Sequence, residues 1–252
     1  MCESGQDYPR GLLLLGHGSD EPAFREEIER LSGQVKEMVS LPFVDVAYLE
    51  RLDPTIATGV ERGLAAGVGE IICTPVFLFA GQDIKGKLPD ALSPSRAKYP
   101  NLSLLLTRPF GPDGRLVEIL QERMREAGLK RPGSGERVIL VGRGSSDPEP
   151  AEGLAELAEM LQERSGFPVN IAFLDGADPD LPIVIGREVA EGATSILVLP
   201  CLLFRGVILN RVAREVESLR EKHPSVQIVL GGHLGPHPNL ARIIAERVRD
   251  AV

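Results

Sequence analysis

Tryptophan is absent from this sequence of 252 residues, and aromatic residues make up only 4% of it. No indole is therefore available to stack on a planar ligand. Cysteine is also scarce, because Cys2, Cys73 and Cys201 stand alone and form no CxxC pair. Zinc ribbons, ferredoxin-type clusters and disulfide frameworks need grouped cysteines, so these classes are excluded. Cys73 and Cys201 lie in apolar runs and are predicted to be small core residues.

Long hydrophobic runs are missing as well. No apolar run approaches the roughly 20 residues of a membrane-spanning helix. The segment Met1–Arg10 is too polar for the apolar part of a signal peptide. The formal net charge of -8 gives no general attraction to nucleic acid or to an anionic membrane. We therefore expect a cytoplasmic protein, a monomer or a homodimer, with neither nucleic acid nor membrane as a partner.

The sequence contains an internal repeat. LLLLGHGSDEP, from Leu12 to Pro22, matches VILVGRGSSDPEP, from Val138 to Pro150. Further along, the segment 47–81 matches the segment 172–206 in the same order and at a nearly constant interval. A connector rich in glycine and proline, residues 128–135, lies between the copies. We predict two domains, 1–128 and 136–252, that arose by duplication.

Each copy alternates short apolar runs with longer amphipathic stretches. Phe24–Val39 and Leu154–Arg164 have helical spacing, and Asp53-Pro54 and Asp178-Pro179 are typical of a helix N-cap followed by proline. Alternating strands and helices favour parallel sheets. The predicted fold class is α/β, with two similar lobes, each a four-stranded parallel sheet with helices on both faces. The apolar runs predicted to be buried strands include Leu12–Leu15, Ile71–Phe79, Leu102–Leu106, Val138–Val141, Ile196–Leu199 and Val226–Leu230.

Polar residues follow the first three strands of the first copy. His17 comes after the first strand, Glu50 after the second, and Gln82 and Asp83 after the third. Ligands of open α/β sheets bind beyond the carboxyl ends of the strands, so these side chains should face one crevice. An imidazole and two carboxylates there are able to bind a divalent metal or act as acid and base. Taken singly, His17 is also typical of a turn, Glu50 of a solvated loop, and Asp83 of a helix N-cap.

The second copy differs at the equivalent positions. Arg143 replaces His17, and Ile208 stands at the place of Asp83. Neither side chain is a metal ligand, so only the first lobe is predicted to bind metal. The turn at Arg143 resembles a phosphate-binding turn, but it lacks the GxGxxG and Walker patterns, and no nucleotide is expected. The spacing of His233 and His237 is a weak zinc signal, because a loop with two prolines does not stack side chains as a helix does.

Together the segments LLLLGHGSDEP, YLERLDPTI, PVFLFAGQDIKGKLP and VGRGSSDPEP resemble the sirohydrochlorin chelatases. These are the cobaltochelatases and ferrochelatases of cobalamin and siroheme synthesis, and the resemblance covers nearly the whole chain, in a long two-lobed form. It implies a chelatase-like fold. It also implies insertion of Co²⁺, Fe²⁺ or Ni²⁺, as a substrate, into sirohydrochlorin or a close relative without ATP.

The same resemblance implies roles for individual residues. His17 and Glu50 match metal-binding and catalytic positions of the family, Asp83 stands where the family has a second histidine, and Lys87 stands at a usually acidic position. An aspartate makes the metal site harder and more anionic. The tetrapyrrole carries many carboxylates, which arginine and lysine bind well. The residues assigned to substrate binding are Ser19, Gln82, Lys85, Lys87, Arg108, Arg143, Ser145 and Arg205.

Two other functions stay open from the residues alone. One is a non-catalytic protein of the same fold that holds a metallated tetrapyrrole or delivers metal. The other is an unrelated hydrolase or lyase that uses His17 and Glu50 as an acid–base pair on an anionic substrate.

Overall fold

Strands and helices alternate along the chain, as the repeat predicts. The computed structural model describes residues 9–129, 131–133 and 135–251. The strands are β1 (Arg10–Gly16), β2 (Phe43–Tyr48), β3 (Glu70–Pro75), β4 (Ser103–Leu106), β5 (Glu136–Gly142), β6 (Val169–Phe173), β7 (Ser195–Pro200) and β8 (Gln227–Leu230). The helices are α1 (Pro22–Met38), α2 (Ile56–Ala65), α3 (Leu88–Lys98), α4 (Gly114–Glu126), α5 (Glu149–Ser165), α6 (Leu181–Ala190), α7 (Val207–Lys222) and α8 (Pro238–Asp250), and a short π-helical segment η1 (Asp83–Lys87) precedes α3.

Two parallel four-stranded sheets form, with the orders β2-β1-β3-β4 and β6-β5-β7-β8. The run Leu12–Leu15 in β1 is fully buried, because helices cover both faces of this central strand. A continuous apolar run is typical of such a strand. The predicted fold class is confirmed.

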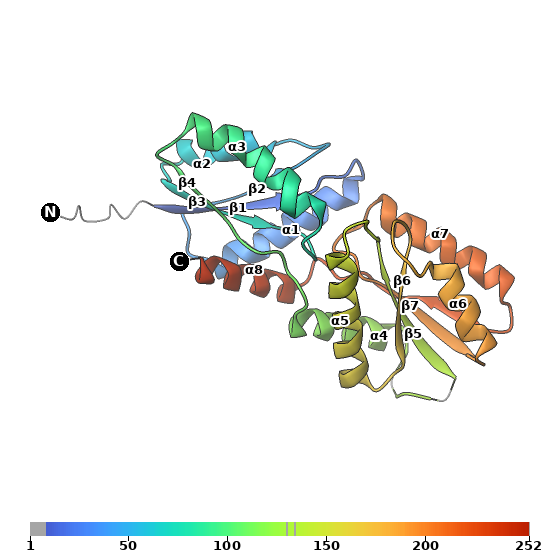
Figure 1. Cartoon of the computed structure of the whole chain (residues 1–252). Coiled ribbons are helices and arrows are strands. Elements are labelled where there is room, and N and C mark those ends of the chain that lie inside the picture. Colours follow the sequence, from blue (N-terminus) through green and yellow to red (C-terminus); the bar gives the residue numbers. More distant parts are fainter. Residues whose placement is uncertain (1–8, 130, 134, 252) are drawn as a thin grey trace.

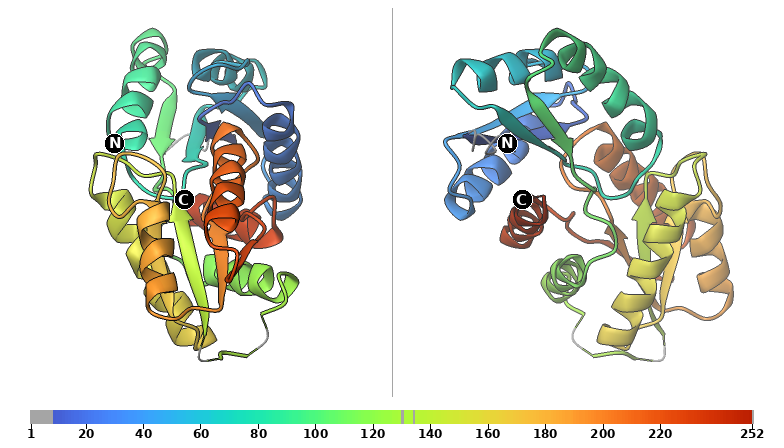
Figure 2. Two further views of the ribbon diagram at one scale, coloured as in Figure 1. Left: turned by 90° about the vertical axis from the view of Figure 1, so that its right-hand side faces the viewer. Right: turned by 60° about the vertical axis from the view of Figure 1, so that its left-hand side comes forward.

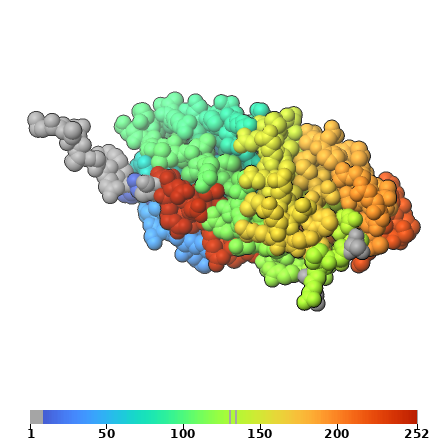
Figure 3. Space-filling model, turned by 60° about the horizontal axis from the view of Figure 1, so that its bottom comes forward, coloured from blue at the N-terminus to red at the C-terminus, as the bar shows by residue number. Residues whose placement is uncertain are grey.

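The last helix of each sequence half crosses to the other lobe. Figure 1 shows α8 beneath the first sheet, where it packs on α1 and β3, while α4 packs on α5 and β7. Both views of Figure 2 show α8 (dark red) and α4 (green) side by side, and in Figure 3 the red surface of α8 lies against the first lobe. The packed lobes therefore differ from the sequence halves by one exchanged helix each. The division into 1–128 and 136–252 stays a prediction about folding units.

This exchange places one apolar core across both lobes. Residues of α8 such as Ile243 and Ile244 share a buried cluster with Leu12 of β1 and with Leu116 of α4, and the cluster continues to Leu140 of β5. Two further clusters lie under the outer helices, one beneath α2 and α3 and the other beneath α6 and α7. Burial of apolar surface on both sides of the junction ties the lobes together.

Some local predictions are wrong. Thr55, not Asp53, caps α2 by accepting a hydrogen bond from the Thr58 N–H, at 3.3 Å. The reason is that Tyr48 N–H donates to the Pro54 carbonyl, at 2.9 Å, and keeps this segment beside β2. The second copy repeats the arrangement, and α6 follows Asp180. Strand β3 ends at Pro75, before the predicted end at Phe79.

The two described cysteines are core residues, as predicted. Cys73 is fully buried and Cys201 is 2% exposed. Burial raises the pKa of each thiol to about 12, so neither is a thiolate at neutral pH. Cys2 and the polar terminus before Pro9 lie outside the described residues. Among the helices that the structure describes, none is long and apolar enough to cross a membrane.

Candidate metal and tetrapyrrole site

The first turn of the site brings His17 beside the end of β2. Glu50 N–H donates to the His17 carbonyl, at 2.9 Å. Gly18 follows with a φ of +99°, and a Cβ at this residue would lie 1.9 Å from the Glu50 carbonyl oxygen. Only glycine allows both the left-handed backbone and this close approach. The glycines around His17 therefore hold the ends of β1 and β2 together.

Asp83 reaches the same place from the end of β3. It opens the π-helical segment η1, in which Leu88 N–H bonds back to the Asp83 carbonyl. The Asp83 carboxylate does not cap this segment, although the sequence allowed that role; Gln82 occupies the N-cap position. Instead, Asp83 Oδ2 lies 3.6 Å from His17 Nε2. Short π-helical turns often occur at functional sites, and this one aims a carboxylate at the imidazole.

The other ring nitrogen of His17 contacts the backbone. His17 Nδ1 lies 3.2 Å from the Gly18 carbonyl oxygen, which is able only to accept. Nδ1 therefore donates in this contact, and Nε2 faces the Asp83 carboxylate. The imidazole is 28% exposed and the Asp83 carboxylate 21% exposed. A half-buried Nε2 of this kind is able to accept a proton or bind a metal ion.

Lys87 links the two carboxylates of the site. Its Nζ lies 2.9 Å from Glu50 Oε1 and 2.9 Å from Asp83 Oδ1. The hydrogen bond from Lys87 holds the pKa of Glu50 below its ordinary value, while bonds to Asp83 and Glu50 raise the pKa of Lys87. Across the described part of the chain, no three His, Cys, Asp or Glu side chains gather as a ready metal cage. Glu50 faces Lys87, and the predicted ligand set stays a prediction.

A cleft between the lobes begins at His17. The cavity measures about 450 Å³, and both lobes contribute cations and apolar side chains to its walls. Its lining includes Ser19, Asp83, Arg143 and Arg205 from the predicted site, together with Phe24, Arg51, Phe77, Phe204, Val207 and Ile208. Apolar walls with a few fixed charges suit a large, flat, anionic ligand.

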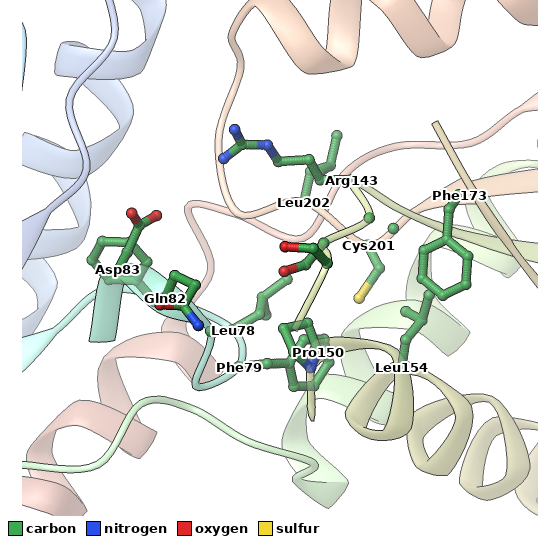
Figure 4. A pocket seen from close by; sticks show the side chains of 16 residues that line it. Leu78, Phe79, Gln82, Asp83, Arg143, Pro150, Leu154, Phe173, Cys201 and Leu202 are labelled. Atoms are coloured by element: carbon green, nitrogen blue, oxygen red, sulfur yellow. The ribbon is translucent and has the colours of Figure 1, made fainter. Parts of the chain in front are cut away.

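A second cavity of about 390 Å³ adjoins the first, and it too is lined by Asp83 and Arg143. Gln82 and Ser145, both predicted to bind substrate, line it as well. In Figure 4, Asp83 and Gln82 lie on one side of this space, and Leu154 and Phe173 lie on the other. Five predicted substrate residues (Ser19, Gln82, Arg143, Ser145 and Arg205) therefore line the connected cavities.

The remaining predicted substrate residues have other contacts. Lys85 Nζ bridges the lobes, at 2.8 Å from Asp147 and 2.9 Å from Glu149. Arg108 lies away from the cleft, 3.8 Å from Asp250 of α8. It follows β4, and the exchanged helix α8 packs nearby. Both cations therefore pair with carboxylates of the protein where the two halves meet, and their assignment to substrate binding stays a prediction.

Sequence reasoning missed three residues at the cleft. Arg51 lines it with a φ of +67° and pairs with Asp20, at 3.0 Å. The repeat contained a signal for this backbone conformation, because the residue equivalent to Arg51 is a glycine, Gly176, and its φ is +64°. Phe204 meets Phe24 of the other lobe edge to face, with ring centres 5.5 Å apart.

A buried carboxylate on α1 was also missed. Glu27 is 8% exposed, and its Oε2 accepts a hydrogen bond from Arg205 N–H, at 2.6 Å. His233 Nε2 lies 3.2 Å from both Glu27 oxygens. His237 lies elsewhere and accepts from Asn239 N–H at the start of α8. The two histidines therefore have separate partners, since His237 Nε2 lies 3.0 Å from Glu122.

Two lobes of this topology, facing each other across a cleft with a histidine–carboxylate pair, define the two-lobed chelatase class of α/β protein. A model of the CbiX family matches residues 11–127 and again 137–251. The chain belongs to the CbiX family. The resemblance found in the sequence is thereby confirmed, and each half of the repeat matches separately.

Similar proteins support this assignment over the full length. A sirohydrochlorin ferrochelatase of Priestia megaterium is 31% identical over 244 residues, which cover 96% of this chain and 91% of that protein. A sirohydrochlorin cobaltochelatase of the same organism is 28% identical over 251 residues, or 98% and 82%. SirB from Bacillus subtilis, solved with Fe³⁺, superposes with a TM-score of 0.86 at 29% identity, covering 96% of this chain and 95% of SirB.

Proposed function

We propose that this protein inserts Co²⁺ or Fe²⁺, and by the same chemistry Ni²⁺, into sirohydrochlorin or a closely related tetrapyrrole without ATP. One observation carries the proposal: His17 Nε2 and Asp83 Oδ2 lie 3.6 Å apart on the wall of an inter-lobe cleft. The full-length similarity to sirohydrochlorin chelatases supports it.

Metal insertion requires an acceptor for protons. A divalent ion enters the macrocycle as two pyrrole N–H protons leave. As the ion passes from His17 into the macrocycle, Nε2 becomes free to accept one of these protons, and the Asp83 carboxylate beside it stabilises the resulting imidazolium. The second proton passes to water in the open cleft. The proposed ligands of the entering ion are the imidazole of His17 and the carboxylates of Glu50 and Asp83, a mixed set that suits Co²⁺ and Fe²⁺.

Three guanidinium groups suit the carboxylates of the substrate. Arg51 belongs to the first lobe, whereas Arg143 and Arg205 face the same cleft from the second. Arginine binds carboxylates in a bidentate manner, while Phe77 and Phe204 offer apolar surface to the macrocycle. An acidic protein is thus able to bind a polyanion through local cations.

The test is a spectral assay of insertion with sirohydrochlorin and Co²⁺. Asp83→Ala should lower the rate and weaken Co²⁺ binding, whereas Asp83→His should retain insertion and shift preference toward Co²⁺ or Ni²⁺, because imidazole is the softer ligand. Thermal melting of each variant checks its folding. Full insertion activity in His17→Ala would reject the mechanism.

A second candidate, a non-catalytic tetrapyrrole- or metal-binding protein, is favoured by a specific observation. The Lys87 ammonium already occupies both carboxylates of the site. Such a protein would give a stoichiometric spectral change without turnover, and Asp83→Ala would be as inactive as the wild type.

A further inference from the structure

The position of Lys87 among the candidate ligands has a structural cause. The π-helical segment η1 places Lys87 four residues after Asp83 and on the same side, so that Nζ reaches Asp83 Oδ1 and Glu50 Oε1 at 2.9 Å each. The second oxygen of Asp83 faces His17 Nε2. An ammonium group therefore occupies the carboxylates that the proposed function assigns to a metal ion.

The second lobe contains a related ion pair, but it has no counterpart of the His17–Asp83 pair at the equivalent positions. Asp175 occupies the place of Glu50 in the repeat, and Arg211 of α7 binds it through a guanidinium hydrogen bond. Ile208 stands at the place of Asp83. A pair between the end of the second strand and the helix after the third strand is thus common to both lobes. Among the residues that the structure describes, Lys87 also pairs with a second carboxylate, Asp83, whereas the ion pair of Arg211 is with Asp175 alone.

Ammonium and metal ion compete for the same oxygens. Lys87 is 50% exposed and sits on a flexible four-carbon stem, so it is able to leave the carboxylates without disturbing the core. While it is bound, the carboxylates are neutralised and directed away from an incoming ion. After an ion departs into a macrocycle, the same ammonium is at hand to take its place.

We propose that Lys87 is a specificity-determining residue that acts as a tethered competitor: its ammonium occupies Glu50 and Asp83, swings out to admit the metal ion, and returns to promote metal release. This inference rests on the proposed function, because it takes His17, Glu50 and Asp83 as the metal site. A chelatase must hold its ion long enough to deliver it and weakly enough to release it. Lys87 shifts that balance toward release.

The experiment measures Co²⁺ binding to the metal-free protein by calorimetry, with Co²⁺ alone as the probe. Lys87→Met, which keeps the length of the side chain but removes the charge, should tighten Co²⁺ binding by about tenfold, the scale of changes around a metal site. Lys87→Arg should bind within about twofold of the wild type. Lys87→Gln repeats the charge removal independently, should Lys87→Met fold poorly.

Arg211→Met is the matched control. It removes the related cation of the second lobe, which pairs with Asp175 and lies outside the proposed metal site, so Co²⁺ affinity should stay unchanged. In single-turnover insertion, Lys87→Met should transfer its bound Co²⁺ more slowly than the wild type.

The two proposals fail in different ways. If His17→Ala and Asp83→Ala weaken Co²⁺ binding while Lys87→Met and Lys87→Gln bind no more tightly than the wild type, the competitor role is overturned and the metal site stands. If His17→Ala and Asp83→Ala bind Co²⁺ as the wild type does, the metal site itself is overturned. Equal tightening in Arg211→Met would show a general charge effect and would also overturn the competitor role.

Discussion

The two lobes share a backbone and differ in what they present to the cleft. Their sheets have the same strand order, and Gly18 and Gly144 make the same left-handed turn after the first strand of each lobe. In both, a carboxylate two residues after the second strand of the lobe pairs with a cation from the helical segment after the third strand. Features that hold the strand ends together have thus been retained through the duplication.

The side chains facing the cleft have diverged. His17 faces Asp83 in the first lobe, whereas Arg143 and Ile208 occupy the equivalent positions in the second. An imidazole beside a carboxylate is able to take up protons and metal, while a guanidinium binds anions. The proposed function therefore divides the work between the lobes: it assigns the chemistry to the first lobe, and substrate-binding charge and apolar surface to the second.

Replacing equivalent residues of the two lobes, one at a time, tests most strongly whether the lobes have different roles. His17→Ala should lower kcat for metal insertion by at least about 100-fold, because a proton acceptor is lost. Arg143→Ala should mainly raise KM, because its guanidinium binds substrate carboxylates in ground and transition state alike. Steady-state rates across sirohydrochlorin concentrations separate the two, and equal losses of kcat would contradict the division.

The shared turn should matter equally for stability in both lobes. A Cβ at Gly18 or Gly144 would meet a backbone carbonyl at 1.9 or 1.5 Å, and the backbone is left-handed at both. Gly18→Ala and Gly144→Ala should each lower the free energy of unfolding by about 2 kcal/mol or more. Urea unfolding measures this loss.

A matched glycine provides the control for that measurement. Gly33 lies inside α1, and nothing lies within 4 Å of a Cβ added there. Gly33→Ala should therefore raise stability by about 0.5–1 kcal/mol. Equal effects at Gly33 and Gly144 would contradict the role of the turn.

Metal stoichiometry tests the asymmetry directly. The wild type should bind a single Co²⁺ per chain in the cleft, whereas the double variant Arg143→His with Ile208→Asp should bind a second, weaker ion in the second lobe. Anomalous scattering at the cobalt edge locates each ion. A wild-type ion at Arg143 would reverse the assignment.

The smallest expected effect concerns a contact that joins the two halves of the repeat, between His233 and Glu27 of α1. Burial lowers the pKa of His233, despite the nearby Glu27 carboxylate, and Arg205 and Arg123 act in the same direction as burial. Unfolded His233 titrates near pH 6.5 and takes up a proton there more readily than the folded form. Stability should therefore be fully present above pH 6.5 and fall as the pH drops below it, by at most about 1.4 kcal/mol per pH unit. Urea unfolding between pH 5 and 7.5 should show a flatter profile in His233→Asn, and an unchanged profile would contradict this origin.

Much of the fold and part of the candidate site could be predicted from the sequence. Apolar runs such as Leu12–Leu15 predicted the strands because a strand buried on both faces admits little else. The position of His17 and Asp83 after successive parallel strands predicted that they would meet, and they lie 3.6 Å apart. The repeat identified the lobe in which they do so, because Arg143 and Ile208 replace them in the other.

Local signals were less reliable where backbone contacts from elsewhere competed. Asp53-Pro54 is typical of a helix start, but the bond from Tyr48 N–H to the Pro54 carbonyl keeps the segment beside β2. Asp83 is typical of an N-cap, but the π-helical turn directs its carboxylate to His17. In both places a partner distant in sequence decided the outcome.

By itself, the sequence determined the element order, the duplication and the residues able to do chemistry, because periodicity and residue type are local properties. Only the tertiary structure decided which lobe each last helix covers, since the apolar face of α8 specifies burial but not the sheet that buries it. The same holds for the cations. From the sequence, Lys85, Lys87 and Arg108 were all assigned to substrate binding, yet folding placed Lys85 across the lobe junction, Lys87 between two carboxylates and Arg108 beside α8. A long charged side chain takes its partner from whatever the packed chain brings within reach, and no spacing in the sequence encodes that.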